Sequence, residues 1–154
     1  MSFETALFPY FEQMRSKVFN QEIANVYGMA SNCLPVSLAA LPIVQQDHPS
    51  AEIHIGVAAR VALAELQNWL PRAQKDFDGF MAGTRSIPTY HSWIELTINN
   101  IDTRLDLTFS ETNPGFSEMW ISDKLTTEKG INYLTIYKGS AIAQQFLDVV
   151  RKTP

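Results

Sequence analysis

A thiol, an imidazole and a carboxylate in this sequence are of the types needed for nucleophilic acyl transfer. Cys33, the only cysteine, lies in a Ser-Asn-Cys-Leu-Pro run, His91 opens a His-Ser-Trp-Ile-Glu run, and Asp106 lies in a Leu-Asp-Leu-Thr run. A thiol attacks carbonyls as the thiolate, which needs a neighbouring base and a positive local field, and the base needs a group that orients it. The sequence therefore predicts Cys33 as nucleophile, His91 as general base and Asp106 as the orienting residue.

Cys33 lies where a helix is predicted to begin. Asn32 or Ser31 can act as the N-cap, and Pro35 is tolerated in a first turn because its missing N–H has no partner there. The helix dipole stabilises a negative charge at this end by about 0.3–1 kcal/mol. The backbone N–H of Cys33 is a candidate oxyanion donor. Asn32 and Tyr27 are candidates for a second, side-chain donor.

The segments 91–98 and 101–109 are predicted to form a β-hairpin. An Asn-Asn pair separates them, and asparagine tolerates the positive φ of a two-residue primed turn. This loop length makes His91 and Asp106 diagonal neighbours on one face, with Cα atoms roughly 7–8 Å apart, so their side chains can hydrogen-bond. A three-residue loop or a bulge would break this arrangement.

The same register divides the side chains of the hairpin between two faces. One face is apolar and is expected to pack on the core, so the face with His91 and Asp106 is expected to be the more open one, toward a cleft. Glu95 opposite Arg104 is interpreted as a structural charge pair worth at most about 1 kcal/mol. Trp93 lies on the same face and is a candidate to support the site by packing.

Periodicity in the rest of the chain predicts the other elements. Helices are expected at 4–19, from 33 to about 41, in two pieces within 60–81 divided at Pro71, and at 140–151; strands are expected at 52–57 and 133–137. We expect Pro42 to kink or end its helix early. Helices come first and mostly adjacent strands follow, which predicts an α+β class with an antiparallel sheet.

Composition places the chain among globular proteins with a sizeable core. Hydrophobic residues are 45% and charged residues 18% of 154 residues, and we expect one domain spanning 1–154. A net charge of −4 without a basic cluster argues against nucleic acid. No secretory signal pattern opens the chain, and the apolar run 33–44 is too short for a bilayer. The single cysteine and the lack of a secretory signal pattern predict a cytoplasmic protein, and the lack of a long apolar run predicts no membrane association.

No cofactor is expected. One cysteine and three scattered histidines lack metal-ligand spacing, and the chain has no glycine-rich phosphate loop.

Together the three runs resemble the transglutaminase-like branch of the papain-like cysteine enzymes. That family carries a cysteine that opens a helix, a His-x-Trp-x-Glu run on a strand and an aspartate on the next strand, matched here at 32–34, 91–95 and 105–108. The resemblance covers about residues 30–110. It implies a papain-like core whose N-terminal helices, the nucleophile helix among them, pack on an antiparallel sheet, and a triad of Cys33, His91 and Asp106.

The same resemblance implies a chemistry rather than one substrate. The family includes peptidases, amidases, deamidases and cross-linking acyltransferases, so the expected partner is a protein or peptide substrate, or a small amide or thioester. Hydrolysis is favoured over transfer to an amine, because water is then the only second substrate.

Structural interpretations of the same residues stay open at this point. A lone cysteine is commonly a small buried hydrophobe, Asp106 can cap a turn or pair with Arg104, and His54 on the polar side of its strand is a rival base. The main alternative to an enzyme is a catalytically inactive protein-binding module of the same fold, of an effector- or immunity-like kind.

Overall fold

A computed structural model describes residues 33–98, 100–123 without 110–117, and 131–153. The elements in chain order are α3 (Cys33–Asp47), β1 (Glu52–Ala59), α4 (Leu63–Asn68), α5 (Leu70–Met81), β2 (His91–Ile98), β3 (Ile101–Phe109), β4 (Glu118–Asp123), β5 (Asn132–Lys138) and α6 (Ser140–Lys152). The predicted helix at 4–19 lies outside the described residues.

The strands form one antiparallel sheet. Its order is β4-β3-β2-β1-β5, and every neighbouring pair is antiparallel. Helices and strands are mixed in the chain, so the predicted α+β class is confirmed. The strand β4 was not predicted, because its short Glu-Met-Trp-Ile-Ser-Asp run shows no alternation of apolar and polar residues.

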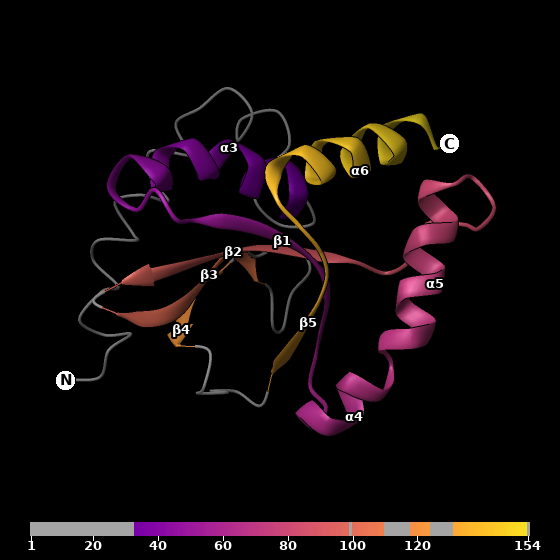
Figure 1. Cartoon of the computed structure of the whole chain (residues 1–154), viewed down its shortest axis with the longest axis horizontal. Helices are drawn as coiled ribbons and strands as arrows, with labels where there is room; N and C mark the ends of the chain where they lie inside the picture. The colour runs from indigo at the N-terminus through magenta and orange to yellow at the C-terminus, as the bar shows by residue number, and fades with distance from the viewer. Residues whose placement is uncertain (1–32, 99, 110–117, 124–130, 154) are drawn as a thin grey trace.

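Helices α3 and α6 lie on the same side of the sheet (Figure 1). They cover its apolar face, and the two layers share one core with the aromatic residues of α5. Fully buried members of this core include Leu34, Val36, Ala40, Val44, Ile53, Ile55, Ile94, Leu105 and Phe146. Burying each large aliphatic side chain contributes about 1.5–3 kcal/mol, so this face holds α3, and hence its first residue, against the strands.

The helix α3 corrects one expectation. Pro35 lies in its first turn as predicted, but the helix continues through Pro42 to Asp47. An interior proline costs a helix about 3 kcal/mol in isolation. Here Pro42 is itself exposed, while Leu41 and Val44 beside it are buried against the sheet. Tertiary packing of these neighbours outweighs the lost backbone hydrogen bond.

The hairpin of β2 and β3 has the predicted register. Ile98 pairs with Ile101 and Glu95 with Arg104, so the loop has two residues. Asn100 has φ of 64°, the left-handed conformation that a primed turn requires. The segment 63–81 is also divided as predicted, because α4 ends at Asn68 and Pro71 lies in the first turn of α5.

A β-bulge between β1 and β5 changes which side chains share a face. Ile55 pairs with Tyr137, but the next residue, Gly56, pairs with Thr135, so Ile136 is an extra residue on β5. In a regular strand, residues four positions apart point to the same face. The bulge instead places Tyr137 on the face that α6 covers and Tyr133 on the opposite face.

Gly56 is required at this bulge because the strands approach closely there. A Cβ atom built on Gly56 would lie 1.8 Å from the carbonyl oxygen of Leu134, which no real contact allows. Gly56 also pairs with His91, the first residue of β2, on its other side. The position of His91 therefore depends on a close backbone approach that only glycine permits.

We predict that Gly56→Ala lowers the free energy of unfolding by about 1–3 kcal/mol or more, because the added methyl forces β1 and β5 apart. Chemical denaturation followed by circular dichroism measures this change. Gly79→Ala is the matched control, since the three atoms nearest to its added Cβ all belong to the flexible side chain of Arg85. Equal stability losses in the two variants would contradict the close-approach argument.

Candidate active site

The second face of the sheet is polar and aromatic, and most of it is buried. We call it the polar face; its members are His54 on β1, His91, Trp93 and Glu95 on β2, Arg104 and Asp106 on β3, and Tyr133 and Thr135 on β5. The expectation of an open face is wrong, because Trp93 and Asp106 are fully buried and Glu95 and Arg104 are each 8% exposed. Polar side chains are tolerated there because they bind one another.

Cys33 is the first residue of α3 and is partly exposed. The neighbouring Leu34 and Val36 are fully buried in the core, which fixes the start of the helix relative to β2. Its thiol lies close enough to the ring of His91 to raise the pKa of that imidazole. Cys33 and His91, which are 58 positions apart in the chain, are therefore neighbours in the fold, as predicted.

His91 lies between the thiol and a carboxylate. Its Nε2 is 2.6 Å from Oδ2 of Asp106, so the predicted diagonal contact across the hairpin is present. Because Nε2 is occupied, Nδ1 is the ring nitrogen left for Cys33. The side chain of His91 is 20% exposed, while that of Asp106 is fully buried. The ring thus joins a fully buried acid to a partly exposed thiol.

The electrostatics of this arrangement favour a charged ring. Burial lowers the pKa of His91, but the charge of Asp106, its hydrogen bond, and the hydrogen bond and charge of Cys33 raise it more, to about 10. His91 is therefore an imidazolium at neutral pH. This positive charge lies beside Cys33.

Tyr133 is part of the site and was not predicted. Its hydroxyl donates a hydrogen bond to Oδ2 of Asp106 at 2.8 Å, the same oxygen that His91 contacts. Burial, and then the negative charge of Asp106, raise the pKa of Tyr133, so the phenol stays protonated and remains a donor. The sequence predicts a strand at 133–137, but it contains no local signal for the bulge that turns Tyr133 toward Asp106.

Tyr90 is a second neighbour of the thiol that sequence reasoning missed. Burial and then the charge of Cys33 raise the pKa of Tyr90 to about 12. Its ring packs edge-on against Phe146 of α6, with centroids 5.0 Å apart. Tyr90 precedes His91 in the chain, so it anchors the start of β2 to the α6 layer.

Trp93 supports the His91 ring from within the polar face. The ring stacks on both His91 and His54 with centroids 6.0 Å apart in each case. Its indole N–H donates to Oε2 of Glu95 at 3.2 Å, so it is not available to an oxyanion. The two candidate side-chain donors, Asn32 and Tyr27, lie outside the described residues.

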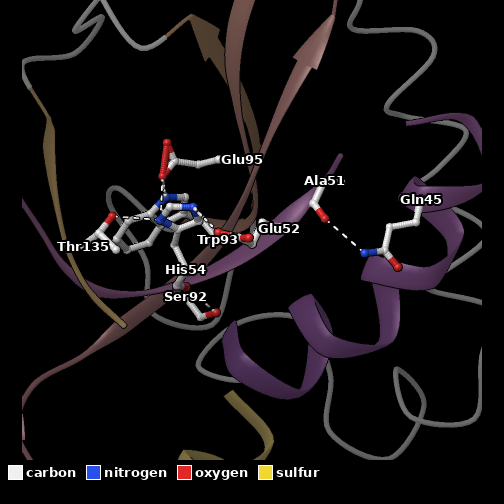
Figure 2. Close-up of polar contacts among 8 residues, drawn as sticks. All are labelled: Gln45, Ala51, Glu52, His54, Ser92, Trp93, Glu95 and Thr135. Carbon is white, nitrogen blue, oxygen red and sulfur yellow. Dashed lines mark hydrogen bonds and ion pairs between the residues drawn. The ribbon is translucent and has the colours of Figure 1, made fainter. Parts of the chain in front are cut away.

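His54, the rival base, belongs to a separate cluster. Its Nδ1 lies 2.8 Å from Oε2 of Glu95 and 2.9 Å from Oγ1 of Thr135. Figure 2 shows these two groups on the ring of His54, with the indole of Trp93 beside it. Glu95 lies opposite Arg104 as predicted, and its charge acts on that guanidinium. It is also buried and bound to His54 and Trp93. This cluster fixes Trp93 and leaves His91 as the imidazole at Cys33.

A cavity of about 560 Å³ opens near the beginning of β2. Thr89, two residues before His91, lines it together with Val57, the residue after Gly56. Phe77 of α5 and the ion-paired side chains Asp76 and Arg85 complete much of the wall. Its described lining includes neither Cys33 nor any member of the polar face.

Other kinds of site receive no support from the described residues. No group of three or more histidine, cysteine, aspartate or glutamate side chains is arranged there to hold a metal ion. Within the same residues, every helix is too short or too polar to cross a membrane. Comparisons with protein-family models, curated proteins and solved structures find no match to this chain. Inference about function therefore depends on the geometry of the site itself.

The raised pKa of His91 predicts a specific pH dependence. The folded value of about 10 lies above the ordinary 6.5, so the stability contributed by the charged ring is complete below about pH 6.5 and disappears as pH rises through 10. NMR of the carbon-bound ring protons of His91 should show a midpoint near 10. Asp106→Asn should lower this midpoint by roughly 1–3 units, because the opposite charge is lost.

The matched control is Asp102→Asn, on the same strand but exposed. It should leave the His91 midpoint unchanged, because Asp102 is not among the groups that shift the pKa of His91. A wild-type midpoint near 6.5 would contradict the ion pair.

Proposed function

We propose that this protein is a thiol-dependent acyl-transfer enzyme with Cys33 as nucleophile, His91 as general acid and base, and Asp106 as the group that orients and charges the imidazole. One observation carries the proposal. The ring of His91 binds the buried carboxylate of Asp106 through Nε2 and lies near enough to Cys33 for the thiol to raise its pKa. These contacts supply the base and the orienting group that a cysteine nucleophile requires.

In the proposed reaction the Cys33 thiolate attacks the carbonyl carbon of an amide or thioester. A sulfur–carbon bond forms and the carbonyl electrons move to oxygen, where the backbone N–H of Cys33 at the start of α3 is the proposed donor. The tetrahedral species collapses, the bond to the leaving group breaks, and the His91 imidazolium gives that group its proton. An acyl-enzyme thioester remains on Cys33.

The second half of the reaction restores the enzyme. Water, or an amine in a transfer reaction, attacks the thioester carbon while neutral His91 accepts its proton. The carbon–sulfur bond breaks, the product leaves as an acid or an amide, and the thiolate and imidazolium are regenerated. Asp106 stays ionised throughout and stabilises the imidazolium that forms in each half. Hydrolysis remains the favoured outcome because it needs only water.

The finer family assignment is part of this proposal. The helix that begins at Cys33 packs on an antiparallel sheet, and the histidine and aspartate lie on adjacent strands. This arrangement supports a papain-like core of the transglutaminase-like kind, acting on a protein or peptide or on a small amide or thioester. A free cysteine nucleophile works in a reducing compartment, so we propose a cytoplasmic location.

The alternative proposal is a catalytically inactive protein-binding module of the same fold, effector- or immunity-like. In such a module the polar face would serve packing alone, and the reactivity of Cys33 would be independent of His91. The two proposals therefore differ in the chemistry of the thiol.

We predict that iodoacetamide alkylates Cys33 rapidly at pH 6 and that His91→Ala slows alkylation by about 10²–10⁴-fold, because the thiolate loses its counter-cation. Mass spectrometry of the labelled peptide measures the rate. Asp106→Asn should stay folded and lose most of the rate, whereas His48→Ala, at a histidine outside the site, should match the wild type. A thiol that reacts slowly and ignores His91→Ala would favour the binding module.

An activated ester should trap the first half of the reaction. We expect p-nitrophenyl acetate to acetylate Cys33 with a burst of p-nitrophenol, because formation of the acyl-enzyme precedes its hydrolysis. Intact-mass and peptide mapping would locate the acetyl group. Cys33→Ala should abolish the burst, and His91→Ala should reduce it strongly. A burst that persists in Cys33→Ala would assign the acylation to another residue and reject the proposal.

A further inference from the structure

The carboxylate of Asp106 depends on a tyrosine from the far side of the sheet. Tyr133 comes from β5, which is separated from β3 by β2 and β1. On β1 the residues of the polar face nearest to it are small, because Tyr133 pairs with Ala58 and Gly56 lies two positions away. These small residues leave the space through which the phenol reaches Asp106.

The aromatic ring of Tyr133 is held on two sides. It packs edge-on against Trp93 with centroids 4.8 Å apart, and the guanidinium carbon of Arg104 lies 4.0 Å from its ring centroid. A cation over a tyrosine face is attracted by the ring quadrupole, and more strongly where both are desolvated. Because the ring is fixed in this way, the hydroxyl has one direction in which to donate, toward Asp106.

One oxygen of Asp106 accepts two hydrogen bonds. Oδ2 receives His91 Nε2 at 2.6 Å and the Tyr133 hydroxyl at 2.8 Å. A fully buried carboxylate is stable as an ion where donors replace its hydration. Two donors on the same oxygen also fix the plane of the carboxylate, and with it the orientation of the imidazole that faces Cys33.

We infer that Tyr133 is a positioning residue of the proposed acyl-transfer site, acting through Asp106 to hold the carboxylate against the ring of His91. This inference rests on the proposed function, since it assigns a role within that site. Tyr133 touches neither the thiol nor the reacting carbonyl in this role. Its effect reaches Cys33 through the carboxylate and the imidazolium.

The test compares Tyr133→Phe with Tyr137→Phe. Both variants keep the ring, remove one hydroxyl from β5 and break one hydrogen bond to an aspartate, Asp106 in the first case and Asp78 in the second. The readout is the rate of Cys33 alkylation by iodoacetamide from pH 5 to pH 9. In Tyr133→Phe the acid limb of this pH–rate profile should move up by about one pH unit, and the rate at pH 6 should fall about tenfold. The reason is that the carboxylate of Asp106 loses one of its hydrogen-bond donors.

Tyr137→Phe should leave the acid limb in place, whatever its effect on stability. A role of Tyr133 in folding alone would lower the melting temperature and leave the limb of Tyr133→Phe unmoved as well, which would overturn the inference. In an Asp106→Asn background, Tyr133→Phe should slow alkylation no further, because the residue acts through that carboxylate. A full additional tenfold loss there would also overturn it.

A second measurement separates this inference from the proposed function. NMR of the His91 ring reports the carboxylate directly, and Tyr133→Phe should lower its titration midpoint from about 10 because the carboxylate is no longer held against the ring. If wild-type alkylation ignores His91→Ala but this midpoint falls, the proposed function is wrong and the positioning role stands. If alkylation depends on His91 but neither the limb nor the midpoint moves, the positioning role is wrong and the proposed function stands.

Discussion

The contact between the His91 ring and the Asp106 carboxylate is the interaction on which the rest of the site depends. Asp106 is fully buried, and its charge is stable there because a ring N–H and a phenol hydroxyl replace water. The same charge outweighs the effect of burial on the ring and raises the pKa of His91 to about 10. Asp106, His91 and Tyr133 are linked by hydrogen bonds and form one unit. Cys33 lies beside the ring of His91.

Backbone features determine whether this unit can form. The two-residue loop sets a register in which His91 and Asp106 share a face, and a slip of one residue would send one of them to the other side. The extra residue at Ile136 sets the face of the sheet on which Tyr133 lies. The close approach at Gly56 holds β1 next to His91. None of these backbone features is a side chain of the candidate site, yet each fixes the direction in which one of those side chains points.

Parts of the fold with a local cause could be predicted from the sequence. The Asn-Asn turn, the alternation on β2 and β3 and the break before Pro71 depend on neighbouring residues, and they led to the pairing of His91 with Asp106. Long-range causes could not be predicted. Packing carries α3 through Pro42, and the bulge that turns Tyr133 inward depends on how β1 and β5 meet. Alternation also shows which residues share a face without showing that the face is buried.

The free-energy cost of burying the polar face supports the proposed enzyme over the inactive protein-binding module. Buried ion pairs contribute little net stability, and apolar residues of similar volume commonly replace them without loss. The opposite face of the same sheet has that composition, with Ile53, Ile55 and Ile94 fully buried. A module that needed only a core could use such residues on both faces. Here an imidazolium is instead kept charged between a buried carboxylate and a partly exposed thiol at a helix start. Perturbed pKa values next to a nucleophile concentrate at sites of chemistry, and packing alone does not require one here.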